Sequence, residues 1–199
     1  MPSDFPVEVQ RDQVGEVFDT DRADLARLAA SDQSDYLPLG VYTAELGYKL
    51  DLKTSVREIA PHAFCATLFS TRMHIILSAR LLHFAKEIRT DPCLLQSTRA
   101  HVMRHALVDD EVLEENADDL PKKLRTAISA LKIETANSDV TARALLMRAV
   151  AKTVELEFDA LDDDRRKLNL AINSPSNLLK QREACRMHAG KSEDLRFAD

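Results

Sequence analysis

The spacing of apolar residues predicts helices along most of the chain. Apolar side chains recur every three or four residues, which is the period of one face of a helix. The expected helices cover 22–29, 63–88, 92–108, 121–133, 140–170 and 175–190, and an element of uncertain type covers 41–50. Because the connections between them are short, neighbouring helices are expected to run antiparallel.

Helix start signals support several of these boundaries. Asp91-Pro92 and Ser174-Pro175 each place a capping residue before a proline, which is favoured at the first helical position. Ser55 and Glu58 have the spacing of a capping box ahead of the apolar stretch. The polar residues 137–139 break one predicted helix and cap the next.

The most apolar stretch, 63–88, sets the expected fold class. Apolar residues occupy most of its circumference when it is drawn as a helix, so we place it at the centre of a bundle. The sequence thus predicts an all-α helical bundle of six or seven helices with short antiparallel connections. Residues 1–19 contain two prolines and little periodicity, and we expect them to form a partly disordered N-terminal arm. Residues 20–199 are expected to form a single α-helical domain.

Composition agrees with this picture. The 199 residues include 45% hydrophobic and 30% charged residues, no Trp and only four Gly. Such a chain is too apolar to be wholly disordered, and it has too few glycines for the many tight turns of a β-sandwich or barrel. The formal net charge is −6.

The cellular compartment is predicted from the first residues, the hydropathy and the cysteine spacing. No stretch is apolar enough to span a membrane, and the first residues lack the pattern of a secretory signal. The three cysteines, Cys65, Cys93 and Cys185, are widely spaced and include no CxxC, so we expect neither a disulfide framework nor a zinc site. A reducing cytoplasm fits this usage best.

Histidines and carboxylates suggest a metal site. His83 and Glu87 form an HxxxE pattern, and His101, His105 and Asp109 follow at successive four-residue steps. Residues four apart lie one above the other on a helix, so each pair offers two ligands on one face. Imidazole and carboxylate together suit Fe, Mn or Zn. The alternative interpretation is a set of ordinary surface and core side chains.

The order of these two motifs resembles the middle of the hemerythrin pattern, over residues 83–105. That resemblance implies a di-iron site in a helical bundle. The chain departs from the pattern because no HxxxxD helix follows, and His188 precedes Glu193 at a different spacing. His62 or His74 would have to supply the earlier helical histidine.

A basic segment suggests a second kind of site. Residues 165–191 hold seven bases and one acid. Clustered Lys and Arg attract nucleic-acid phosphates, so this segment is a candidate nucleic-acid surface, although the acid run at 109–119 or 162–164 could neutralise it instead. Its candidate binding residues are Arg165, Arg166, Lys167, Lys180, Arg182 and Arg186.

No catalytic motif accompanies these patterns. The sequence has no GxGxxG, P-loop, GxSxG or HExxH motif. We therefore predict a non-enzymatic accessory subunit that works through protein–protein association, with metal binding and nucleic-acid contact as alternatives. The long helix over 140–170 is expected to leave an apolar strip for a partner or a second copy.

Overall fold

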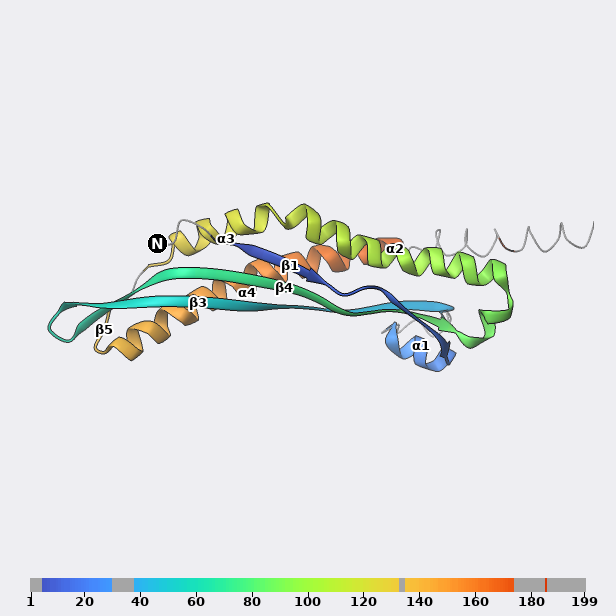
Figure 1. Cartoon of the computed structure of the whole chain (residues 1–199), viewed down its shortest axis with the longest axis horizontal. Helices are drawn as coiled ribbons and strands as arrows, with labels where there is room; N and C mark the ends of the chain where they lie inside the picture. The colour runs from blue at the N-terminus through green and yellow to red at the C-terminus, as the bar shows by residue number, and fades with distance from the viewer. Residues whose placement is uncertain (1–4, 30–37, 133–134, 174–184, 186–199) are drawn as a thin grey trace, which may run out of the picture. The chain divides into compact units, whose positions relative to one another are not determined.

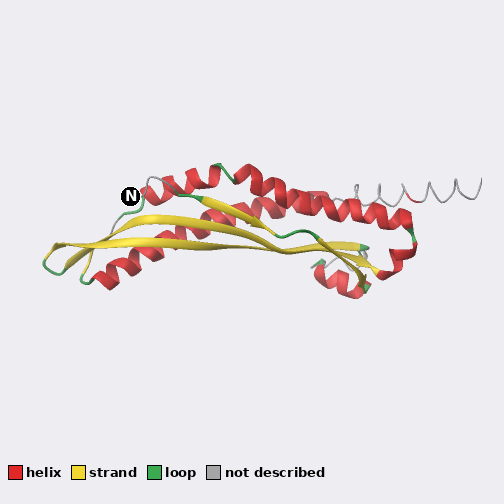
Figure 2. Cartoon of the chain, viewed as in Figure 1, coloured by secondary structure: helices red, strands yellow, loops and turns green. Residues whose placement is uncertain are grey.

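The computed structural model describes residues 5–29, 38–132, 135–173 and Cys185. Four α-helices, one 3-10 helix and five strands lie within these ranges (Figures 1 and 2). The strands are β1 (Val7–Arg11), β2 (Gly15–Thr20), β3 (Gly40–Ala60), β4 (Ala63–Ala85) and β5 (Thr135–Ala136). The helices are α1 (Arg22–Leu28), η1 (Lys86–Thr90), α2 (Pro92–Asn116), α3 (Asp119–Ser129) and α4 (Asp139–Ile172).

The all-α prediction is therefore wrong, because the fold is mixed α/β. Strand β4 pairs with every other described strand: β1 and β2 run parallel to it, and β5 runs antiparallel. Strand β3 also pairs with β4, to which it is joined by the two residues 61 and 62. The expected arm supplies β1 and β2, and the element of uncertain type at 41–50 belongs to β3.

Two phase shifts in β4 explain why its sequence pattern predicts a helix. Buried side chains alternate along the strand, but the alternation skips an extra residue after Leu68 and again after Leu77. The second skip contains Ala79, whose φ is 51° and whose N–H donates to Asp12 at 3.2 Å. Each shift moves the buried set from even to odd positions or back, as a bulge does. Apolar residues of both parities then appear in one run and imitate an all-round apolar helix.

The capping box predicted before this stretch is also wrong, since both of its residues belong to β3. The Ser55 hydroxyl lies 2.7 Å from the Thr67 hydroxyl, an interaction between paired strands. The Glu58 carboxylate accepts the His62 N–H at 3.2 Å, which closes the turn between β3 and β4. His62 has a φ of 61°, so the turn follows the pattern of a proline and then a left-handed residue.

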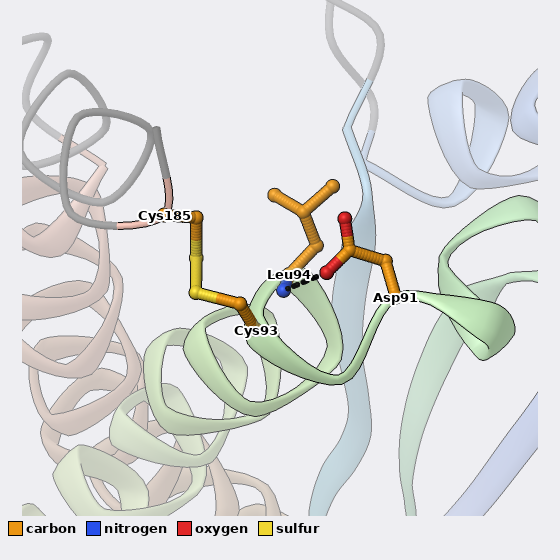
Figure 3. The surroundings of a disulfide bond; sticks show 4 residues. All are labelled: Asp91, Cys93, Leu94 and Cys185. Atoms are coloured by element: carbon orange, nitrogen blue, oxygen red, sulfur yellow. Dashed lines mark hydrogen bonds between the residues drawn. A yellow bond between two sulfur atoms is a disulfide. The ribbon is translucent and has the colours of Figure 1, made fainter. Parts of the chain in front are cut away.

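The later helices follow the sequence prediction more closely. Helix α2 begins at Pro92, and the Asp91 carboxylate accepts the Leu94 N–H at 3.0 Å (Figure 3). Helix α4 begins after Ser138, whose hydroxyl accepts the Thr141 N–H at 3.2 Å. Helix α2 continues through Asn116, beyond the predicted end at 108, so the acid run at 109–119 is largely helical. The helix predicted at 175–190 lies outside the described residues, apart from Cys185.

The chain divides into two compact units, and each is described by itself. The described residues of unit 1 fall within the ranges 1–11, 46–77 and 111–164, and those of unit 2 fall within 12–45, 78–110 and 165–199. In unit 1, α3 buries Leu120, Leu124 and Ile128, one per turn. Phe158 of α4 contacts the ring of Tyr48 on β3, with ring centroids 4.7 Å apart.

Unit 2 contains an apolar cluster built from α1, β4, η1 and α2. Its fully buried members are Leu25, Leu82, Phe84, Ala85, Ile88 and Val102. Phe18 of β2 stacks on Phe84 with ring centroids 5.1 Å apart. Gly40 allows β3 to approach α2 closely, because a Cβ at this position would lie 2.6 Å from the Thr98 methyl group.

Candidate functional site

The predicted metal ligands do not form one group. His83 lies on β4, where its Nε2 is 3.0 Å from the Thr43 hydroxyl. Glu87 is exposed in η1, so the four-residue step from His83 does not follow a helix. Asp109 is completely buried on α2 and pairs with Arg165. Within the described ranges, no group of three or more His, Cys, Asp or Glu side chains is placed to hold a metal ion.

His101 and His105 are brought together as their spacing predicts. Their rings meet edge to face with centroids 5.2 Å apart. The Nε2 atom of each ring lies 3.1 Å from the same atom, Oδ1 of Asn173. Burial, and then the neighbouring charge of His105, lower the pKa of His101. The helical step therefore identified this pair, although the amide of Asn173, the residue after α4, was not expected.

A chain of polar side chains holds His105 in place. Its Nδ1 lies 2.8 Å from Oδ1 of Asn169, whose Nδ2 donates to Asp109 Oδ1 at 2.9 Å. The Arg165 guanidinium donates to both Asp109 oxygens, at 2.8 and 3.1 Å. Sequence reasoning missed Asn169 and Asn173 because each is about 65 residues or more from its partner on α2 and neither belongs to a ligand motif.

A buried arginine lies in the same unit. Arg80 is only 5% exposed, and its guanidinium donates to Asp110 at 2.8 Å and to the Ala106 carbonyl at 3.0 Å. It also donates to the Tyr42 hydroxyl and to the Asp12 carbonyl, both at 3.2 Å. Burial raises the pKa of Tyr42 to about 12. Such full hydrogen bonding is what allows a cation to be buried, so this cluster is structural.

The candidate nucleic-acid residues are only partly described. Arg165 turns inward to Asp109, whereas Arg166 and Lys167 are exposed on α4. Lys180, Arg182 and Arg186 lie outside the described residues. Because Arg165 is engaged in a buried ion pair, it is not part of a free basic surface.

Cys185 is bonded to Cys93 at the start of α2, with Cα atoms 5.7 Å apart (Figure 3). The sequence predicted no disulfide framework, and it did not identify this pair. Disulfides persist mainly in oxidising compartments, so the pair and the predicted cytoplasmic location favour different environments. The location therefore stays a prediction. None of the described helices is long and apolar enough to cross a membrane.

The described part of α4 carries an exposed apolar stripe. Val140 is 71% exposed and Met147 is 42% exposed, and the exposed Ala144 and Ala151 complete the spacing. We call these four residues of unit 1 the α4 stripe. Their intervals of four, three and four residues are those of a coiled-coil seam. A different face of the same helical segment is buried through Ala142 and Val150.

Comparison with protein-family models, with curated proteins and with solved structures found no significant match to this chain.

Proposed function

We propose that this protein is an association module that binds an apolar, acid-flanked helix of another protein through the α4 stripe. The observation that carries the proposal is the second apolar face of α4. One face of residues 139–154 packs into unit 1, while the α4 stripe is exposed. The unit's own core leaves it uncovered within the described residues.

The small and large residues of the stripe suit a helical partner. Val140 and Met147 offer bulk, and Ala144 and Ala151 between and beyond them allow a helix backbone to come close. Knobs of a facing helix pack into holes made by such a seam. The contact is three turns long, so affinity will depend on a few central side chains, as it does at most protein interfaces.

Charges beside the stripe select the partner. Three exposed bases, Arg143, Arg148 and Lys152, lie next to it, and the exposed acids Asp139 and Glu155 lie at its two ends. In a parallel pairing of two copies, Arg143 would face Arg148 of the second copy. An antiparallel pairing centred on the stripe would bring Arg148 close to its own counterpart. Like charges oppose both modes, whereas Glu or Asp in a different helix would be attracted.

Fluorescence anisotropy with a synthetic helical peptide tests this proposal. The probe carries Leu and Ala at the seam positions and Glu at the flanking positions; a second peptide has Lys in place of Glu. We expect saturable binding of the Glu peptide that weakens with added salt, and at least about tenfold weaker binding by Met147→Lys.

Leu156→Lys is the matched control, because Leu156 is 62% exposed on the same helix but lies away from the stripe. This variant should bind the Glu peptide like the unchanged protein. Equal binding of the two peptides, or equal loss in both variants, would overturn the proposal. Stronger binding to anionic lipid vesicles than to the peptide would also overturn it, since basic apolar helices bind such surfaces.

A further inference from the structure

The geometry around Asn173 points to a metal site separate from the α4 stripe. We propose that His101 Nε2, His105 Nε2 and Asn173 Oδ1 bind one divalent transition-metal ion, with Zn²⁺ as the first ion to test. All three residues belong to unit 2. The two ring nitrogens come from one face of α2, and the amide oxygen comes from the residue that follows α4.

The distances suit neighbouring ligands of one ion. Each Nε2 atom lies 3.1 Å from Asn173 Oδ1. Ligand bonds of about 2.0–2.1 Å around zinc place neighbouring donor atoms roughly 3 Å apart. The edge-to-face rings of His101 and His105, 5.2 Å apart at their centroids, direct both Nε2 atoms toward the same oxygen.

The hydrogen bonds of Asn169 determine which ring nitrogen of His105 is available to an ion. Asn169 Nδ2 donates to Asp109 Oδ1 and to the Arg165 carbonyl, which turns its Oδ1 toward His105. The Nδ1 atom of His105 therefore donates to Asn169 Oδ1, and Nε2 is the ring nitrogen of His105 that is left for an ion. A metal ion bound by this Nε2 and by Asn173 Oδ1 lies beside the line that joins them, because each bond of about 2.0–2.1 Å is longer than half of their 3.1 Å separation.

The surroundings of His105 have the form of metal-site support. Histidine ligands usually donate their second ring N–H to an oxygen that is itself held in place. Here Asn169 supplies that oxygen, and the completely buried Asp109 fixes Asn169. The Arg165 guanidinium balances the charge of Asp109. The orientation of His105 is thus determined before any ion binds.

The donor set indicates binding more than hydrolysis. Two imidazoles favour zinc, nickel or copper, and a set of three protein donors leaves coordination positions for water or an anion. The residue after His101 is Val102, which is buried in the apolar cluster. In an HExxH motif this position holds the glutamate that acts as general base. The site therefore lacks that base on α2.

Isothermal titration of tag-free protein with Zn²⁺, and visible spectroscopy with Co²⁺, test the site. We expect one equivalent to bind and Co²⁺ to give the absorption of nitrogen and oxygen coordination. His101→Ala and Asn173→Ala should each weaken binding at least about tenfold. His74→Ala is the matched control, since His74 contacts Glu8 and Asp51 in unit 1 and should leave the affinity unchanged.

Nitrogen NMR of the histidine rings distinguishes metal binding from a simple hydrogen-bonded cluster of the two histidines and Asn173. If the Asn173 amide is turned, its NH₂ group donates to both Nε2 atoms and no ion is needed. Zn²⁺ should shift the Nε2 signals of His101 and His105 together and leave the protonated Nδ1 of His105 in place. Absence of one-equivalent binding, unchanged binding by Asn173→Ala, or ring signals that do not respond to Zn²⁺ would overturn the proposal.

Discussion

The Arg165 guanidinium donates to both carboxylate oxygens of Asp109, from Nε to Oδ1 at 2.8 Å and from Nη2 to Oδ2 at 3.1 Å. Asp109 is completely buried, and the Arg165 side chain is 15% exposed. The pair joins α2 to the end of α4 within unit 2. It also holds Asn169, and through Asn169 the ring of His105.

Removal of one member of this pair should destabilise the protein strongly. We expect Asp109→Asn to lower the free energy of unfolding by about 3 kcal/mol or more, because it leaves the arginine charge without its partner. Urea denaturation followed by circular dichroism measures this. Asp119→Asn is the control, since its ion pair with Lys122 is exposed and should contribute less than about 1 kcal/mol. Equal losses in the two variants would contradict the assigned role.

Replacement of two glycines of β3 by alanine should change the stability of the protein by different amounts. At Gly40 a Cβ would lie 2.6 Å from the Thr98 methyl and 3.1 Å from the His83 carbonyl, whereas at Gly47 it would meet no atom within 4 Å. We expect Gly40→Ala to cost about 1–3 kcal/mol through overpacking. Gly47→Ala should be neutral or slightly stabilising. Thermal unfolding of the two variants compares them directly, and a larger loss at Gly47 would be inconsistent with this packing.

The backbone at position 79 should accept glycine better than the alanine that occupies it. Its φ of 51° lies in the left-handed region, where a side chain is strained and glycine is not. We expect Ala79→Gly to change the free energy of unfolding by about 0 to +1 kcal/mol, the relief of strain exceeding the added chain entropy. Ala85→Gly provides the comparison, because Ala85 is buried and lies in the same strand without a positive φ. That control should be destabilised.

The raised pKa of Tyr42 leads us to expect a loss of stability at high pH. Burial raises its pKa to about 12, against about 10 in an unfolded chain. The folded state therefore favours the neutral phenol, so this contribution is complete below pH 10 and is lost as the pH rises through 12. The loss is of the order of 1–3 kcal/mol. Comparison with Tyr42→Phe isolates it: the stability difference between the two proteins should shrink from pH 9 to 12. A constant difference would contradict the shift.

The starts of α2 and α4 were predictable because local capping chemistry decides them. The Asp91 cap and Pro92 fix the start of α2, and the cap at Ser138 fixes that of α4. The strands were not predictable in the same way. Their pairings join residues far apart, such as Val7 and Met73, and the two phase shifts hide the alternation in β4. Long-range pairing overrides the periodicity of a short window.

The candidate sites show the same division. The four-residue step of α2 brought His101 and His105 together as predicted. Asp109, on the same face, instead pairs with Arg165, which lies 56 residues away in the sequence. His83 and Glu87 were assigned to a helix that does not form there, so their spacing had no structural meaning. The predicted strip on the long helix has a counterpart in the α4 stripe, while its role in association stays a proposal.

Hydrogen exchange of the whole protein, with and without the Glu-flanked peptide, tests the central proposal most directly. Added peptide should slow exchange of backbone amides in α4 over residues 140–151 and leave α3, which lies in the same unit, unchanged. It should have no such effect on Met147→Lys. Protection that falls elsewhere on the chain, or equal protection of α4 in that variant, would contradict an association role for the α4 stripe.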